Sequence, residues 1–296
     1  MLNKKEFAIL TYLEANNNEK LTQKELAEEL DFSVGTVNKL WNDLEEKGFI
    51  ENKQITKKGL NALEPYRVKR AIFIAAGFGS RLVPITLNTP KPLVRVKGVR
   101  IIDTLLDAVI AAGIEEIIIV RGYLAEQFDQ LKYKYPMVKF VENPLYNEAN
   151  NISSVMCIRY LLSNAYVLEA DLLLSNPKLI TKYQYSSNYL GVPTEKTDDW
   201  CFFMEGDRIK KLGVGGLNCH HMFGISYWTE DDGRKLCNHV EQVYNSPGGK
   251  ERYWDQVALG EYIKEYNVGV RECTFDDIVE IDTFRELKEL DKVYDV

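Results

Sequence analysis

The chain has 296 residues, 45% of them hydrophobic and 27% charged, which is a composition typical of a globular protein. This length is sufficient for one large domain and one small domain. The net charge of −7 argues against non-specific binding to nucleic acid or to a membrane surface. The sequence contains no apolar run of membrane-spanning length, no signal-peptide core and no CxxC pair among its five cysteines. We therefore expect a cytoplasmic protein with free thiols.

Residues 1–66 have the pattern of a small helical module. A capping-box pattern at Thr22 predicts the start of one helix, and Ser33 predicts the start of the next. Residues 49–55 then fit a two-stranded wing. The segment 21–51 resembles the winged helix-turn-helix of bacterial regulators, in which the second helix enters the major groove of DNA.

This resemblance implies DNA contacts from polar residues of the second helix, namely Ser33, Thr36, Asn38 and Lys39. The charge of the module argues against that role. Residues 1–66 contain nine lysines, no arginine and twelve acidic residues, a sum of −3, whereas DNA affinity depends on neutralising phosphates. We favour an interaction or regulatory role and leave DNA binding, like a homodimer, open as an alternative.

Strands and helices alternate from residue 70 onward, which predicts a Rossmann-like α/β fold with a mostly parallel sheet covered by helices on both faces. The expected strands cover residues 71–76, 116–121, 137–141 and 165–169, and the expected helices cover residues 101–112, 124–134 and 151–162. An antiparallel extension is expected from short strands at 189–192, 201–204 and 223–227 and helices at 232–244 and 254–265. The expected domains are a winged helix-turn-helix domain, residues 1–66, and an α/β domain, residues 67–296.

A glycine-rich loop follows the first strand of this α/β region. Gly77 and Gly79 let backbone amides approach a phosphate, and Arg81 and Lys91 supply positive charge. The loop is neither a Walker A motif nor a dinucleotide fingerprint, because the required lysine and third glycine are missing. The full pattern AAGxGSRLxPxTxxxPKPL resembles the signature of nucleotidyltransferases with a nucleoside-diphosphate-sugar pyrophosphorylase-like fold.

The resemblance implies roles for the residues around this loop. Arg81 would hold the β- and γ-phosphates of a nucleoside triphosphate, Lys91 would bridge the α-phosphate and the incoming phosphate, and both would act in catalysis with Asp171. Asparagine and serine side chains in residues 143–154 can pair with a pyrimidine edge. The implied nucleotide-binding residues are Ala75, Ala76, Gly77, Gly79, Arg81, Lys91, Asn147, Asn151, Ser153, Glu169 and Ala170.

Two carboxylates are candidates for a metal site. Asp171 follows the strand 165–169, at the place where the family has an aspartate that binds Mg²⁺. Mg²⁺ typically takes one or two carboxylates plus substrate phosphates, so a partner is required. The motif EIDT matches the second acid of the family and makes Asp282 that partner, whereas Glu280 is equally compatible with a surface position.

Three tryptophans of the extension stand beside acidic residues. Core packing explains any single tryptophan better, but aromatic faces with carboxylates at their rim suit a quaternary ammonium group, and the three together favour such a site. We expect this acceptor site to contain Tyr189, Trp200, Trp228, Trp254 and Asp255.

The motifs NNISS, EADxxLS, DW, GISYW, YWD and EIDT narrow the resemblance to the bacterial CTP:phosphocholine cytidylyltransferase branch. This branch implies an enzyme that uses Mg²⁺ to condense CTP with phosphocholine, a small phosphorylated amino-alcohol. Sugar-phosphate relatives carry a Glu-Lys pair where this chain has residues 213–216, GVGG, which argues against a sugar phosphate. The lysine that holds the acceptor phosphate is left open among Lys196, Lys210 and Lys211. The alternatives are phosphoethanolamine or 2-aminoethylphosphonate as the acceptor, and a nucleotide-sensing transcriptional regulator.

Overall fold

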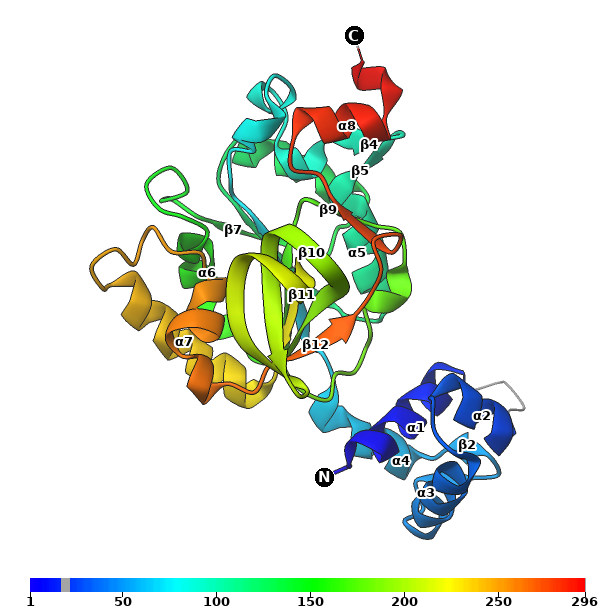
Figure 1. Ribbon diagram of the computed structural model, residues 1–296. Coiled ribbons are helices and arrows are strands. Elements are labelled where there is room, and N and C mark those ends of the chain that lie inside the picture. Colours follow the sequence, from blue (N-terminus) through cyan, green and yellow to red (C-terminus); the bar gives the residue numbers. More distant parts are fainter. Residues whose placement is uncertain (17–21, 296) are drawn as a thin grey trace. The chain divides into compact units, whose positions relative to one another are not determined.

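The computed structural model describes residues 1–16 and 22–295 (Figure 1). The chain forms two compact units. Unit 1 consists of Met1–Arg67 together with Tyr183–Tyr185, and unit 2 consists of Val68–Lys182 together with Ser186–Val296. No helix in the described part of the chain is long and apolar enough to cross a membrane.

Unit 1 is a winged helix-turn-helix. Its elements are α1 (Lys4–Ala15), α2 (Gln23–Glu29), α3 (Val34–Glu46), β1 (Ile50–Glu51), β2 (Gln54–Ile55), α4 (Lys57–Leu63) and a 3-10 turn (Glu64–Tyr66). The predicted helix starts are confirmed, because Thr22 forms a capping box with Glu25 and the Ser33 side chain accepts a hydrogen bond from the Thr36 N–H. The antiparallel β1–β2 pair is the wing.

Unit 1 also includes three residues from far along the chain. The Tyr185 ring stacks on Tyr66 with a centroid distance of 5.5 Å, and its hydroxyl donates to the carbonyl of Leu2 at 3.3 Å. Tyr183 is buried in the same hydrophobic cluster as the helices. No pattern in the sequence indicated that this segment completes the helical module, because the contact joins residues more than a hundred positions apart.

Unit 2 is built on a seven-stranded sheet with the order β12-β10-β11-β8-β3-β6-β7. Its strands are β3 (Arg70–Ala75), β6 (Glu116–Arg121), β7 (Lys139–Glu142), β8 (Ala165–Glu169), β10 (Asn188–Glu205), β11 (Arg208–Trp228) and β12 (Gly269–Glu272). The pairs β8–β3, β3–β6, β6–β7 and β10–β12 are parallel, and β11 is antiparallel to both β8 and β10. Two small antiparallel pairs are β4 (Arg95–Val96) with β5 (Val99–Arg100) and β9 (Leu172–Leu174) with β13 (Ile278–Glu280).

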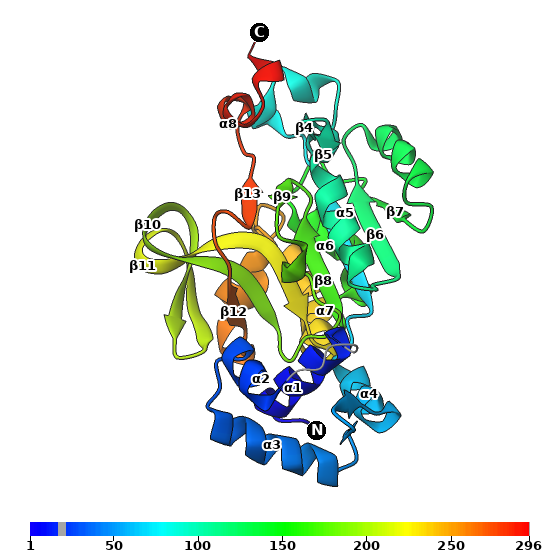
Figure 2. The same ribbon diagram turned by 90° about the vertical axis from the view of Figure 1, so that its right-hand side faces the viewer.

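Helices cover both faces of this sheet (Figure 2). The helices that cover the sheet are α5 (Ile101–Ala111), α6 (Ile152–Ile158) and α7 (Glu230–Tyr244), whereas α8 (Phe284–Leu290) packs with Leu82 and Val96 in a separate cluster. One buried cluster joins α5 to Phe73 and Ile119, and another joins α6 and α7 to Ile72 and Ile118. Because neighbouring strand residues point to opposite faces, this division confirms the predicted two-sided α/β fold.

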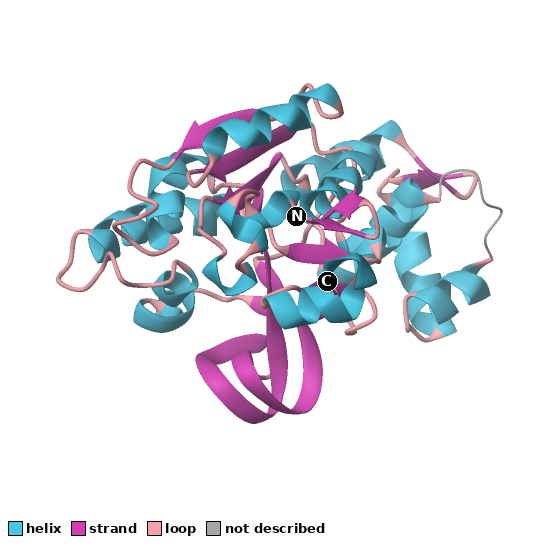
Figure 3. Cartoon of the chain, turned by 90° about the horizontal axis from the view of Figure 1, so that it is seen from above, coloured by secondary structure: helices cyan, strands magenta, loops and turns pink. Residues whose placement is uncertain are grey.

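Several predicted elements differ from those observed. The expected helix 124–134 is a 3-10 helix (Ala125–Tyr133), the helix 151–162 is α6 followed by a 3-10 turn (Arg159–Leu161), and the helix 254–265 is a π-helical turn (Val257–Glu261) followed by a 3-10 turn (Ile263–Glu265). The three short strands of the extension belong to the two long strands β10 and β11, which curl away from the sheet (Figure 3). Register shifts and exposed polar residues in the middle of these strands break the alternation that a sequence pattern detects.

The glycine-rich loop lies where the order of the strands in the sheet reverses, which is called a topological switch point. The chain runs from β3 to β6 and β7 on one side and then returns to β8 on the other side of β3, so the strand order reverses between β3 and β8. Ligands in open α/β sheets bind at the carboxyl ends of the strands beside such a switch point. The loop after β3 and Asp171 after β8 therefore meet at one edge.

Candidate active site

A cavity of about 610 Å³ opens at this edge of unit 2. It is lined by the glycine-rich loop, the end of β8, the middle of β10 and β11, and three further segments around residues 150–151, 253–255 and 280–282. We call residues 143–154 the nucleotide segment and residues 250–255 the acceptor segment. The cavity thus joins the loop typical of phosphate binding to the extension.

Two cations of the cavity are held by two carboxylates. The Lys91 ammonium lies 2.7 Å from Asp171 Oδ2 and 3.1 Å from Asp282 Oδ1. Arg81 donates to both oxygens of Asp282, from Nη1 at 2.9 Å and from Nη2 at 2.8 Å. Burial lowers the pKa of Lys91, but the carboxylates of Asp171 and Asp282 outweigh it and raise that pKa, so the ammonium stays charged. These two cations therefore lie side by side in a position to receive phosphates.

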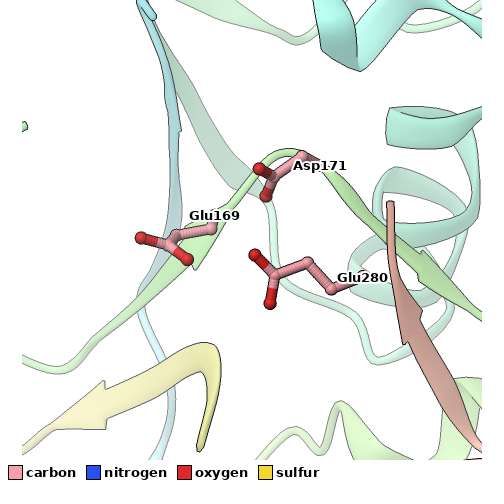
Figure 4. Close-up of side chains that lie close together, drawn as sticks. All are labelled: Glu169, Asp171 and Glu280. Atoms are coloured by element: carbon pink, nitrogen blue, oxygen red, sulfur yellow. The ribbon is translucent and has the colours of Figure 1, made fainter. Parts of the chain in front are cut away.

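Three carboxylates form a second cluster beside this pair. Oxygen atoms of Glu169, Asp171 and Glu280 lie within 4.8 Å of one another, with Glu169 and Asp171 at the end of β8 and Glu280 on β13 (Figure 4). Asp171 Oδ1 is buried and has no hydrogen-bond partner among the described residues. Burial, followed by the charge of Asp171, raises the pKa of Glu169 and of Glu280 well above the ordinary value. An all-oxygen donor set with an unpaired buried oxygen fits a hard divalent cation.

Local structure explains why these acids meet. β13 pairs with β9 so that Glu280 faces Leu172, the residue after Asp171. Glu169 lies against Gly224 of β11, where an added Cβ would come within 2.2 Å of Glu169 Oε2. Gly224 therefore leaves the room that the buried carboxylate needs.

The sequence placed Asp282 beside Asp171 as a metal ligand, and the structure sets it apart from the acid cluster. Both oxygens of Asp282 are bound by Arg81, and one also contacts Lys91. Its backbone N–H donates to Glu286 in the capping box of α8, which fixes its position. Glu280, which the sequence left open as a surface residue, joins the cluster instead. The role of Asp282 as a ligand stays a prediction.

The opposite wall of the cavity is aromatic and acidic. The rings of Trp200 and Tyr253 meet edge to face at a centroid distance of 5.4 Å, and Asp199 and Asp255 line the cavity beside them. The Tyr189 hydroxyl donates to Asp255 Oδ1 at 2.7 Å. Burial raises the pKa of Asp255 to about 6, so the carboxylate is charged at neutral pH.

Two of the three tryptophans that the sequence predicts at the acceptor lie in the core of the structure. Trp228 is 0% exposed and Trp254 is 2% exposed, and their rings pack against each other at 6.0 Å in the core behind the cavity. Tyr189 is equally buried, and none of the three is among the described residues that line the cavity. For Trp254 the reason is that side chains alternate along the YWD motif. The Trp254 side chain is buried in the core, whereas Tyr253 and Asp255 on either side of it line the cavity.

The residues predicted to bind the nucleotide are likewise divided between those that line the described cavity and those that do not. Of the residues predicted to bind the nucleotide, the described cavity lining includes Ala75, Gly77, Gly79, Arg81, Lys91, Asn151 and Glu169 but not Ala76, Asn147, Ser153 and Ala170. Their binding of a nucleotide stays a prediction. Ser153 is 2% exposed and accepts a hydrogen bond from the Asn143 amide at 2.9 Å, so its hydroxyl is engaged within the protein. Asn150, which the sequence did not single out, lines the cavity instead.

None of the three candidate lysines for the acceptor phosphate lines the cavity in the described part of the chain. Lys196 pairs with Asp198, Lys210 pairs with Glu205, and Lys211 lies over the Phe203 ring. The positive charge of the described cavity comes from Arg81 and Lys91.

The site defines a class of enzyme. A glycine-rich loop after the first strand, a pair of cations for phosphates and a carboxylate cluster at the next strand end are the parts of a nucleotidyltransferase site. The middle of this chain, residues 70–185, matches the family model "Nucleotidyl transferase", and residues 2–51 match the model "Winged helix-turn-helix DNA-binding".

Individual proteins make the assignment more specific. The chain is 35% identical over 241 residues to 2-aminoethylphosphonate cytidylyltransferase of Lancefieldella rimae, covering 80% of this chain and 96% of that protein. It is 33% identical over 226 residues to choline-phosphate cytidylyltransferase of Streptococcus pneumoniae, covering 76% and 97%. The solved structure of CTP:phosphocholine cytidylyltransferase from Streptococcus pneumoniae superposes with a TM-score of 0.71 at 34% identity, covering 77% of this chain and 99% of that one. The chain therefore belongs to the nucleotidyl transferase family, as a cytidylyltransferase.

We expect Glu169→Gln to raise the midpoint of thermal unfolding at pH 8 while lowering the rate of cytidylyl transfer. Burial raises the pKa of Glu169 above its ordinary value of 4.5, so the folded protein keeps a proton that the unfolded chain releases. Stability therefore falls as the pH rises from that value through the folded pKa, and the neutral glutamine removes this loss. A gain of about 1 kcal/mol corresponds to roughly 2–4 °C.

The matched control is Glu126→Gln, which changes an exposed glutamate and should leave the midpoint unchanged. Scanning calorimetry at pH 5 and pH 8 measures both variants. A lower midpoint for Glu169→Gln at pH 8 would mean that the fold itself requires the carboxylate.

Proposed function

We propose that this cytidylyltransferase condenses CTP with phosphocholine to give CDP-choline and pyrophosphate. The observation that carries the proposal is the aromatic edge of Trp200 and Tyr253 beside the Asp255 carboxylate. An aromatic face attracts a quaternary ammonium group, and a desolvated site strengthens that attraction. The cavity lining holds six acidic residues and two basic ones, an excess that suits a cationic acceptor and a metal ion.

The residues of the chain mainly position the substrates and neutralise charge. A phosphate oxygen of phosphocholine attacks the α-phosphorus of CTP in line, a new P–O bond forms, and the bond to the pyrophosphate oxygen breaks. Arg81 and Lys91 receive the phosphates by exchanging part of their contacts with Asp282 and Asp171. No side-chain nucleophile is required, because the acceptor phosphate is already an anion.

We also propose that Asp171, with Glu280, Glu169 or Asp282 as its partner, holds Mg²⁺. The support is the orphaned Asp171 Oδ1 and the all-oxygen donor set around it. When bound, the ion supplies positive charge that stabilises the triphosphate and the leaving pyrophosphate.

A second candidate acceptor is 2-aminoethylphosphonate, with phosphoethanolamine as its phosphate counterpart. A primary ammonium group donates hydrogen bonds to carboxylates, and Asp199 and Asp255 both line the cavity. The similar protein from Lancefieldella rimae is named 2-aminoethylphosphonate cytidylyltransferase.

For unit 1 we propose an interaction or regulatory role. Helix α3 contains one lysine and three acidic residues, so it neutralises few DNA phosphates even though Ser33, Asn38 and Lys39 are exposed. The family model that matches this unit leaves DNA binding as the alternative. A salt-sensitive gel shift with genomic DNA would support that alternative.

A pyrophosphate-release screen tests the proposed reaction. The four nucleoside triphosphates are each combined with phosphocholine, phosphoethanolamine, 2-aminoethylphosphonate and sugar phosphates. We expect the highest kcat/KM for CTP with phosphocholine. A higher value for 2-aminoethylphosphonate would establish the second candidate, and turnover with sugar phosphates alone would overturn both.

We expect Asp171→Asn to lower kcat by on the order of a hundredfold or more, because a metal ligand contributes several kcal/mol of charge stabilisation. The fold should persist, and the dependence of the remaining rate on Mg²⁺ concentration should shift to higher concentrations. Asp276→Asn is the control, since it changes an exposed acid close to β13. Near-normal pyrophosphate release by Asp171→Asn would remove Asp171 from the metal site.

We expect Trp200→Ala to raise the KM for phosphocholine by on the order of threefold to thirtyfold, the loss of one cation–π contact. The KM for CTP should change much less. Trp200→Phe should recover part of the effect, and Tyr160→Ala, at a 70% exposed ring outside the cavity lining, serves as the control. An equal rise in both KM values would contradict an acceptor role for this wall.

A further inference from the structure

Three hydrogen bonds tie the acceptor segment to the nucleotide segment. The Asn150 N–H donates to the Lys250 carbonyl at 2.8 Å, and the Asn150 Nδ2 donates to the Glu251 carbonyl at 3.2 Å. Asn151 Oδ1 accepts from the Trp254 N–H at 2.9 Å. Two neighbouring asparagines thus hold a segment that lies a hundred residues further along the chain.

The hydrogen bond to Asn151 is made at the middle of the part of the acceptor segment that lines the cavity. The Trp254 ring is anchored in the core, and the residues on either side of it, Tyr253 and Asp255, reach the cavity. The bond from the Trp254 N–H to Asn151 therefore acts at the centre of the segment. A shift of Asn151 would therefore act on Tyr253 and Asp255 together, one on either side of the bonded Trp254.

The asparagines themselves are fixed to the parallel sheet. The Asn150 carbonyl accepts from the Ser153 hydroxyl at 2.8 Å, and Ser153 Oγ accepts from Asn143 Nδ2 at 2.9 Å. The Asn143 N–H in turn donates to the carbonyl of Arg121, the last residue of β6. Asn143 and Ser153 are each 2% exposed, so these bonds form in a desolvated environment where losing a partner is costly.

We propose that Asn150 and Asn151 are positioning residues that couple the nucleotide and acceptor sites. Both line the cavity from the nucleotide segment, and both fix the wall that faces the acceptor. A nucleotide that contacts them orders the acceptor segment, so the acceptor binds a wall that is already in place. By reciprocity, a bound acceptor raises the affinity for the nucleotide by the same factor. This inference rests on the proposed function for the identity of the acceptor.

The test follows the amides of the acceptor segment by hydrogen–deuterium exchange, with and without an α,β-methylene analogue of CTP at saturation. We expect the analogue to slow the exchange of the Trp254 backbone amide in the wild-type protein. The effect should vanish in Asn151→Leu and weaken in Asn150→Asp, which replaces the donor facing the Glu251 carbonyl. Asn151→Asp keeps an oxygen for the Trp254 N–H, and it should therefore retain the protection seen without the analogue.

Gln256→Leu is the matched control. Gln256 Oε1 accepts from the Tyr253 N–H at 3.0 Å, so the variant also removes a hydrogen bond to this segment, but the bond does not come from the nucleotide segment. It should leave the response to the CTP analogue intact. Equal responses in Asn151→Leu and the wild-type protein, or no response in the wild-type protein once calorimetry establishes binding, would overturn the coupling.

A kinetic measurement complements the exchange experiment. Asn151→Leu should raise the acceptor KM by on the order of threefold to tenfold, the loss of one hydrogen bond. Saturation with the α,β-methylene analogue, which cannot react with the acceptor, should no longer lower the acceptor dissociation constant in this variant. The exchange experiment needs only the nucleotide analogue, so a wrong acceptor assignment fails in the pyrophosphate screen while a wrong coupling fails here.

Discussion

The contacts of Lys91 with Asp171 and Asp282 are the interaction on which the active site depends. They join the glycine-rich loop, the end of β8 and the segment after β13, which are distant in sequence. A buried ammonium group is stable only when it is paired, and the same holds for the carboxylates around it. Each of these segments therefore supports the charge of the others, and Arg81 completes the arrangement through Asp282. The ion pairs with Asp171 and Asp282 thus fix Lys91 and Arg81 in the positions where they could contact a triphosphate.

Acidic side chains outnumber basic ones at both ends of the cavity. Burial raises the pKa of Glu169, Glu280 and Asp255, which means that enclosing these groups costs free energy of folding. Such a cost is common where a site is arranged for chemistry rather than for stability. A metal ion at one end and an ammonium group at the other would both lower it. The same electrostatic feature thus supports the proposed reaction and the proposed class of acceptor.

The reaction class was readable from the sequence because the signals that carry it are local. The glycine-rich loop with Arg81 and Lys91 occupies about twenty consecutive residues, and the caps at Thr22 and Ser33 depend on neighbours three residues away. Asp171 is recognisable from the sequence because it lies just past the end of the strand Ala165–Glu169, where the resembling family has an aspartate. The curled β10–β11 pair was missed, since its bulges and polar middle remove the period-two pattern that marks a strand.

The sequence by itself determined the two-unit organisation in outline, the α/β class and the residues of the glycine-rich loop, because each follows from short-range patterns of apolar, glycine and charged residues. Only the tertiary structure decided which aromatic residues face the cavity, since Trp228 and Trp254 could equally have packed inward or outward from their sequence surroundings. It also decided that Glu280 joins the carboxylates and that Asn150 and Asn151 hold the acceptor segment. These features depend on contacts between residues about a hundred positions apart, and no local pattern encodes such contacts.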